Sequence, residues 1–184
     1  HRIKNSLQTL SAMVRLHARQ LDDKATVNVL DGIQRRVNAM ATLHGELQSG
    51  GGRDEVDAGK YLGKVVSLLQ ETAPGHVQIS YSADQATLRS NMASSLGLII
   101  SEFAANSIKH GFPDASPGHI EIELTLRDGR FHLACKDNGI GSKNEGKRRP
   151  DSIGQTLMAA AASQLDAQVD HSLTPEGSRL SLTF

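Results

Sequence analysis

Four side chains of different chemistry fall within the stretch SEFAANSIKHGFPD, residues 101–114. Glu102, Asn106 and Lys109 follow one another at steps of four and three, so a helix places them on one face, with His110 at its edge. A carboxylate can orient or deprotonate a water, an amide oxygen suits Mg²⁺, and an ammonium offers positive charge to a phosphate. The set has the parts of a magnesium–nucleotide site, although a solvated helix face is the commoner origin of such a pattern.

A second polar motif, KDNGIGS, comes at the end of an alternating apolar segment. Asp137 places a carboxylate at a strand end, and Gly139 and Gly141 follow with no side chains to keep a ligand away. Such a carboxylate can accept a hydrogen bond from the exocyclic amine of adenine, although Asp-Asn-Gly is also common turn chemistry. Further on, Ser152 and Gly154 precede a helical pattern whose N-terminal amides are suited to phosphate. The order of these three motifs is more specific than any one of them.

The elements that must position these motifs can be read from hydrophobic periodicity. The pattern predicts three helices and a mostly antiparallel sheet, segregated rather than strictly alternating, which indicates a two-layer α+β sandwich. Asp128-Gly129 is a strong hairpin signal, and Gly111 and Pro113 mark the end of the central helix. The predicted helices cover residues 57–73, 91–110 and 153–165, and the predicted strands lie in 76–83, 119–137 and 168–184, the last pair around Pro175-Glu176-Gly177.

The segment before residue 49 carries two runs of mostly apolar residues at alternating steps of four and three, each with one histidine. The pattern predicts two helices joined by the short turn LDDKAT, an antiparallel hairpin. A lone hairpin buries little area, so we expect a second copy to complete a four-helix bundle at a homodimer interface; the alternative is a hairpin docked on the C-terminal half of its own chain. The runs are Ile3, Leu7, Leu10, Val14, His17 and Leu21, then Leu30, Ile33, Val37, Met40, His44 and Leu47.

Three consecutive glycines, Gly50–Gly52, mark a flexible joint between this hairpin and the mixed pattern that follows. We therefore expect a helical hairpin over residues 1–48, a linker over 49–55 and a second domain over 56–184. The 184 residues are enough for two small domains.

The composition bears on which class of molecule the protein binds and in which cellular compartment it works. The 20 basic and 20 acidic residues balance and aromatic residues make up 3%, so neither charge nor stacking points to nucleic acid. The single cysteine, Cys135, lies in a predicted buried strand and favours a cytoplasmic setting. No apolar run approaches the ~20 residues that span a bilayer. Because the first residue is a histidine, we expect a longer chain, with a sensor domain or a membrane anchor upstream.

With these motifs in order, the sequence resembles a known family over essentially its whole length. LIISEFAANSIKHGFP, DNGIGS and SIGQTL resemble the successive nucleotide-binding boxes of sensor histidine kinases, which belong to the GHKL ATPase superfamily. HRIKNSLQTLSAMVRLHARQ resembles the phosphoacceptor segment of the second histidine-kinase subgroup, close to the HWE group. The resemblance implies a dimerisation and phosphotransfer hairpin followed by a Bergerat-type ATP-binding domain.

The resemblance also implies roles for individual residues. It assigns His1 as the phosphoacceptor and Asp137 as the reader of adenine, with Asn106 as the ligand of Mg²⁺ and Glu102 as the residue that orients or activates by hydrogen bonding. Independently, His1 lies two residues before the seam position Ile3 and so flanks the core, where an imidazole stays exposed. The other box residues are expected to contact ATP: Lys109, His110, Gly139, Gly141, Ser152, Gly154 and Ser178.

The remaining histidines are expected to have structural positions. His17 and His44 occupy seam positions, where packing or hydrogen bonding is the simpler reading. The sequence indicates no partner for the histidines that lie near or in predicted strands, which are His76, His119, His132 and His171.

The sequence departs from the family at several positions, which leaves two functions open. Gln155 and Thr156 replace the apolar continuation of the third box, and Ser178 stands where threonine is common. Asn91 and Ser95 stand where an aspartate and a proline are usual. The first hypothesis is an ATP-dependent protein-histidine kinase that autophosphorylates His1 and passes phosphate to the receiver domain of a response regulator. The alternative is a histidine phosphotransferase or scaffold whose C-terminal domain has lost ATP binding.

Overall fold

The computed structural model describes residues 55–141 and 153–184. These residues belong to one compact unit, Glu55–Phe184. The predicted helical hairpin with His1, Gly50–Gly52 and the loop around Ser152 lie outside the described residues.

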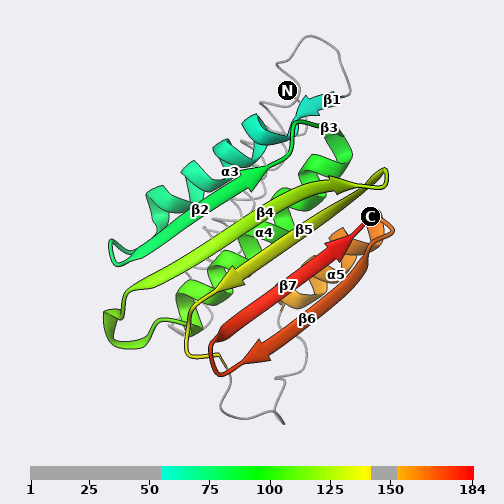
Figure 1. Cartoon of the computed structure of the whole chain (residues 1–184). Helices are drawn as coiled ribbons and strands as arrows, with labels where there is room; N and C mark the ends of the chain where they lie inside the picture. The colour runs from blue at the N-terminus through cyan, green and yellow to red at the C-terminus, as the bar shows by residue number, and fades with distance from the viewer. Residues whose placement is uncertain (1–54, 142–152) are drawn as a thin grey trace, which may run out of the picture. The chain divides into compact units, whose positions relative to one another are not determined.

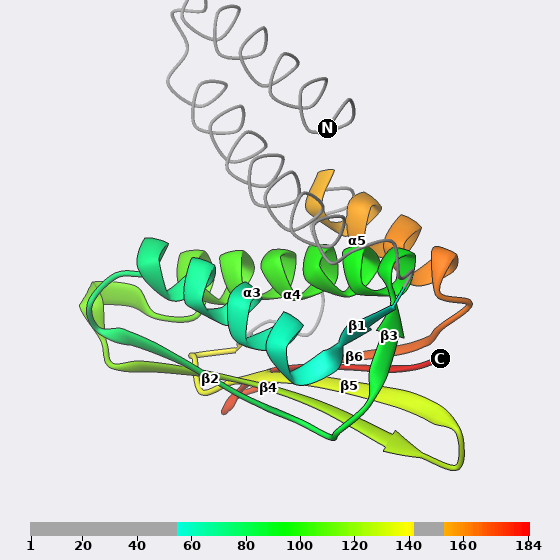
Figure 2. The same cartoon turned by 90° about the horizontal axis from the view of Figure 1, so that it is seen from above.

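The unit has two layers, as the sequence predicts. A five-stranded sheet in the order β2-β4-β5-β7-β6 carries the helices on one face (Figures 1 and 2). The described elements are β1 (Glu55–Asp57), α3 (Ala58–Thr72), β2 (Val77–Ala83), β3 (Thr87–Arg89), α4 (Ser90–His110), a 3-10 turn η1 (Pro113–Ala115), β4 (Gly118–Arg127), β5 (Arg130–Asp137), α5 (Ile153–Gln164), β6 (Gln168–Thr174) and β7 (Gly177–Thr183).

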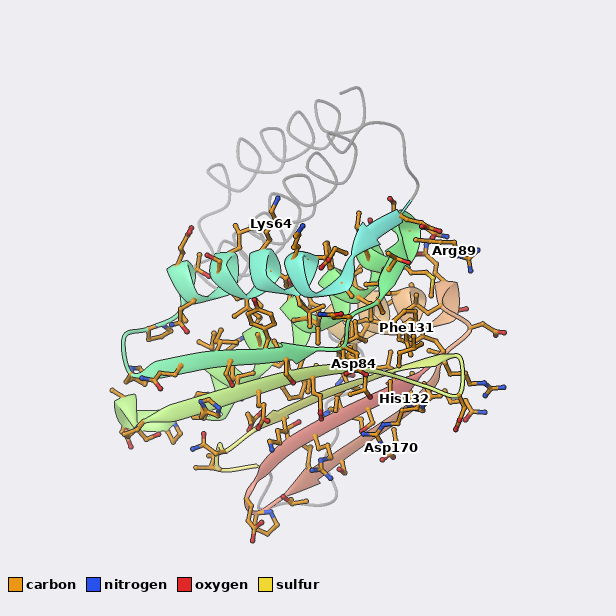
Figure 3. All side chains as sticks on the ribbon, turned by 45° about the horizontal axis from the view of Figure 1, so that its top comes forward. Lys64, Asp84, Arg89, Phe131, His132 and Asp170 are labelled. Atoms are coloured by element: carbon orange, nitrogen blue, oxygen red, sulfur yellow. The ribbon has the colours of Figure 1, made fainter. Side chains whose placement is uncertain are left out.

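The alternation of side chains along the strands explains why the sheet is covered on one face only. In β4, Ile120, Ile122 and Leu124 are buried, whereas the residues between them, Glu121 and Glu123, are half-buried or exposed. Lys136 of β5 forms a salt bridge with Glu121 on this outer face. Figure 3 labels His132 and Asp170 on the strands, and Lys64 on the side of α3 away from the sheet. One face of the sheet therefore needs helices and the other faces solvent.

The hairpin between β4 and β5 forms where the sequence predicts it. Asp128 and Gly129 both have positive φ, 51° and 73°, as a two-residue type I′ turn requires. The ladders β4–β5, β5–β7 and β6–β7 are antiparallel, and β2–β4 is parallel. The long connection that contains α4 allows this parallel pair.

The sequence reading missed a second, two-stranded sheet. β1 and β3 pair antiparallel over three residues each, and strands this short show no readable alternation. The pair leads into both long helices: Asp57 accepts a hydrogen bond from the Lys60 N–H and caps α3, and Arg89 immediately precedes α4. The small sheet therefore sets where both helices start.

The core lies between α3, α4 and the sheet. Leu62, Leu96 and Ile100 from the helices and Ile120 from β4 have no exposed surface. Cys135 is also fully buried, as predicted, and burial raises the pKa of its thiol to about 12, so it is a packing residue rather than a nucleophile. None of the described helices is long and apolar enough to cross a membrane.

One glutamine on α3 protects an open edge of the sheet. β2 is an edge strand, and edge strands expose backbone groups that can pair with other chains. The Gln70 side chain donates to the Val77 carbonyl at 2.9 Å and accepts from the Ile79 N–H at 2.8 Å. One amide therefore occupies the groups that a further strand would use.

Replacing Gln70 by alanine is expected to lower the free energy of unfolding by about 1 kcal/mol, because two hydrogen bonds along the edge are lost. Urea denaturation measures the change. Gln78→Ala is the matched control, since Gln78 is an exposed glutamine in β2 itself. Equal losses in the two variants would contradict a specific role for Gln70.

Candidate functional site

The site is centred on Asp137, the last residue of β5, whose carboxylate accepts three hydrogen bonds from three different parts of the fold. Oδ2 accepts from the Ser107 hydroxyl of α4 at 2.6 Å. Oδ1 accepts from the Gly139 N–H at 2.9 Å and from the Ser178 N–H of β7 at 3.1 Å. The three hydrogen bonds fix the direction of the carboxylate, and the residue is half-buried rather than fully buried.

The loop after Asp137 is fastened to the strand beside it and to the helix above it. Asn138 Oδ1 accepts from the His119 N–H at 2.6 Å, and the Asn138 N–H donates to the His119 carbonyl. The Ile140 N–H donates to the Gly111 carbonyl at 2.9 Å. Gly111 is the residue after α4, so these bonds hold the loop against the end of the helix that carries the polar side chains.

The glycines at this junction serve backbone packing. A Cβ on Gly139 would lie 2.7 Å from the Gly111 Cα, and a Cβ on Gly111 would lie 2.7 Å from the Ser107 carbonyl oxygen. A Cβ on Gly141 would collide with the Thr174 carbonyl oxygen, and Gly141 also has a φ of 55°. The sequence predicts that Gly139 and Gly141 leave room for a nucleotide to approach. In the structure they also let the loop pack closely against the end of α4 and against β6.

The polar residues of α4 run from the core to solvent. Glu102 is fully buried, Asn106 is half-buried one turn later, and Lys109 and His110 are exposed in the last turn. Burying a carboxylate costs free energy, so the fully buried Glu102 is a candidate for function. Glu102 and Asn106 share a face because they are four residues apart.

Ser178 carries a second polar group beside Asp137. Its hydroxyl lies 3.1 Å from His171 Nε2 on β6, while its backbone N–H bonds to Asp137. The described residues thus join Asp137, Gly139 and Ser178 directly. Gly154 is buried at the second position of α5, and Gln155 and Thr156 after it are exposed.

The sequence does not single out Ser107, and it indicates no partner for His171. Ser107 is adjacent to Asn106 in a small-residue stretch, and nothing in its spacing marks it as the partner of an aspartate 30 residues later. Gly111 follows the last residue of α4, as predicted, but its φ of −84° is right-handed, so the position requires its small size rather than a left-handed conformation. The sequence indicates no partner for the histidines in or near strands, and this expectation is wrong for three of them. His119 contacts Ser80, His132 contacts Thr183, and His171 contacts Ser178.

One departure from the family has a structural explanation. Ser95, which stands where a proline is usual, is buried in α4 and donates its hydroxyl to Gln164 Oε1 at 2.9 Å. Gln164 is the last residue of α5. The serine therefore links the two helices whose motifs are expected to meet the ligand.

The geometry favours recognition of a hydrogen-bond donor. A carboxylate offers roughly four acceptor positions; within the described residues Oδ1 receives two donors and Oδ2 receives one. The remaining lone pair of Oδ2 suits an amine, such as that of adenine. Three fixed donors hold this acceptor in one direction, so little ordering is needed when a ligand arrives.

Two family models match consecutive parts of the chain. The model described as histidine kinase matches residues 1–73. The model described as histidine kinase-like ATPase domain matches residues 70–184. The second alone covers more than half of the chain.

Curated relatives agree with these matches. A blue-light-activated histidine kinase of Erythrobacter litoralis is 26% identical over 147 residues, which cover 77% of this chain and 42% of the relative. The sensor histidine kinase PdtaS of Mycobacterium tuberculosis is 28% identical over 177 residues, which cover 94% of this chain and 34% of the relative. The chain thus spans less than half the length of these relatives.

The fold matches solved structures of the same kind. The histidine kinase domain of a blue-light-activated histidine kinase from Erythrobacter litoralis superposes with a TM-score of 0.76 at 19% identity, covering 100% of this chain and 92% of that one. At this identity the likeness concerns the fold.

Gly139→Ala is expected to lower the free energy of unfolding by roughly 1–3 kcal/mol, because the new methyl group forces the loop away from Gly111. Gly75→Ala is the control, since a Cβ there meets nothing within 4 Å. Thermal denaturation followed by circular dichroism compares the two variants. If both are equally stable, the loop is not held by close backbone packing.

Proposed function

This chain belongs to the histidine-kinase family, whose members are transferases, and we propose that it uses ATP and Mg²⁺ to phosphorylate its own His1. The observation that carries the proposal is the Asp137 carboxylate, held by Ser107, Gly139 and Ser178 with one acceptor position left.

Adenine is proposed to bind with its exocyclic amine at Asp137 Oδ2. The amine would donate to the lone pair that Ser107 does not use. Because the carboxylate is already fixed by its three donors, recognition costs little side-chain entropy. Gly139 and Gly141 keep the approach free of side chains while they fasten the loop to α4.

The phosphates and Mg²⁺ are proposed to lie along the exposed end of α4. Mg²⁺ keeps several waters and is usually held by one or two protein groups together with substrate phosphates, so the Asn106 amide oxygen is a sufficient protein ligand. When bound, the ion neutralises charge on the phosphates. Lys109, His110 and Gly154, the second residue of α5, are proposed to contact the phosphates together with Ser152. Glu102 is proposed to orient the polar groups around Asn106.

The proposed reaction transfers one phosphoryl group. A ring nitrogen of His1 attacks the γ-phosphorus, a nitrogen–phosphorus bond forms, and the bond to the bridging oxygen breaks to release ADP. Catalysis would come chiefly from positioning and charge neutralisation. Histidine kinases typically act as dimers and signal to response regulators, so we further propose a homodimer through residues 1–48 and transfer of the phosphate to an aspartate of a receiver domain.

Asp137→Asn is expected to weaken ATP binding at least tenfold, because the new NH₂ group faces donors instead of accepting from them. Calorimetry with a non-hydrolysable ATP analogue and Mg²⁺ measures the affinity. Asp170→Asn, an exposed aspartate of β6, is the control and should bind as the parent does. No binding by the folded parent at millimolar nucleotide would favour the phosphotransferase or scaffold function.

Labelling with γ-labelled ATP, in a chain extended upstream of His1, is expected to give an acid-labile, base-stable phosphate. His1→Ala should lose the label and retain ATP binding, since the label and the nucleotide use different domains. Persistence of the label in this variant would show that another residue accepts the phosphate. Labelling only from a phosphorylated regulator would identify a phosphotransferase.

A further inference from the structure

A histidine on the edge strand lies next to the Asp137 cluster, outside every motif of the sequence. His171 Nε2 is 3.1 Å from the Ser178 hydroxyl. The β6–β7 register pairs His171 with Leu180, which is buried, so His171 lies on the face of the sheet that carries the helices. Through Ser178, this imidazole is connected to Asp137 Oδ1.

We propose that His171 is a positioning residue that directs the Ser178 hydroxyl hydrogen toward the nucleobase and thereby favours adenine over guanine. The inference rests on the proposed function, because it concerns the same nucleotide. It adds a residue, His171, that lies outside the motifs and outside the hydrogen bonds that Asp137 accepts.

The direction of one hydrogen bond decides what Ser178 can offer. A neutral imidazole protonated on Nε2 donates to the Ser178 oxygen. The serine hydrogen is then available to donate to a ligand. If the serine instead donated to Nε2, its oxygen would present only lone pairs to the ligand. The proposal assigns the first arrangement, in which Asp137 accepts and Ser178 donates side by side.

This pair of groups matches adenine and opposes guanine. The edge of adenine presents an amine donor beside a ring-nitrogen acceptor, which suits Asp137 Oδ2 and the Ser178 hydroxyl. The corresponding edge of guanine presents a carbonyl acceptor beside an N–H donor. The guanine carbonyl would face the Asp137 carboxylate, so two acceptors would meet with no donor between them. Such mismatches strongly reject a ligand.

The sheet supplies a matched control. His132 Nδ1 lies 3.0 Å from the Thr183 hydroxyl, directly across the β5–β7 ladder. Strand alternation places His132 on the face opposite its buried neighbour Leu133, the outer face (Figure 3). The pair has the chemistry of His171 and Ser178 but lies on the other side of the sheet from Asp137.

The test measures affinities for ATP and GTP with Mg²⁺, by calorimetry, in the parent and in single variants. His171→Ala is expected to lower the ratio of ATP to GTP affinity about tenfold, the equivalent of one hydrogen bond. His171→Gln should restore the ratio, because a glutamine N–H can donate to Ser178 from a similar position. His132→Ala should leave both affinities unchanged.

A second background shows whether His171 acts through Ser178. In Ser178→Ala, the further change His171→Ala should leave the ratio unaltered, whereas a merely structural histidine would add its own effect. Melting temperatures show that each variant is folded. An unchanged ratio in folded His171→Ala, with ATP still bound, overturns this inference and leaves the proposed function intact. A parent that binds no ATP overturns both.

Discussion

One carboxylate connects the layers of this fold at the place where its motifs meet. Asp137 ends β5, and its three donors come from α4, from the following loop and from β7. Hydrogen bonds to a carboxylate offset the cost of burying part of it, so the helix end, the loop and the strand that supply them stabilise one another's positions. The position of the candidate site is therefore a consequence of satisfying Asp137.

Close backbone approach makes this arrangement possible. Gly111, Gly139, Gly141 and Gly177 lie where a Cβ would strike neighbouring backbone or the Asp137 carbonyl oxygen. Glycine gives up conformational entropy on folding, and the cost is met here because the hydrogen bonds to Asp137 need that proximity. The residues that build the candidate site and those that hold the fold are thus largely the same, and a change at any of them is expected to affect both stability and the proposed binding.

Much of the unit Glu55–Phe184 could be predicted from local sequence. Alternation in 119–137, the Asp128-Gly129 turn and the length of the central helix are local signals, and the structure confirms all three. What could not be predicted depends on side-chain contacts between separate elements of the fold: Ser107 with Asp137, Gln70 with the edge of β2, and His171 with Ser178. Single polar residues carry no periodicity, so their partners appear only when the sheet order is known. The strands β1 and β3 could not be predicted because three residues are too few to show an alternating pattern.

The most direct test of the account uses the donors to Asp137 as reporters. Amide resonances of Gly139 and Ser178 are recorded by two-dimensional NMR while a non-hydrolysable ATP analogue is added with Mg²⁺. The account predicts that both resonances shift together and saturate at one dissociation constant, because a ligand at Oδ2 changes the charge distribution that both N–H groups face. Saturable binding of the analogue that leaves both resonances unmoved would contradict it.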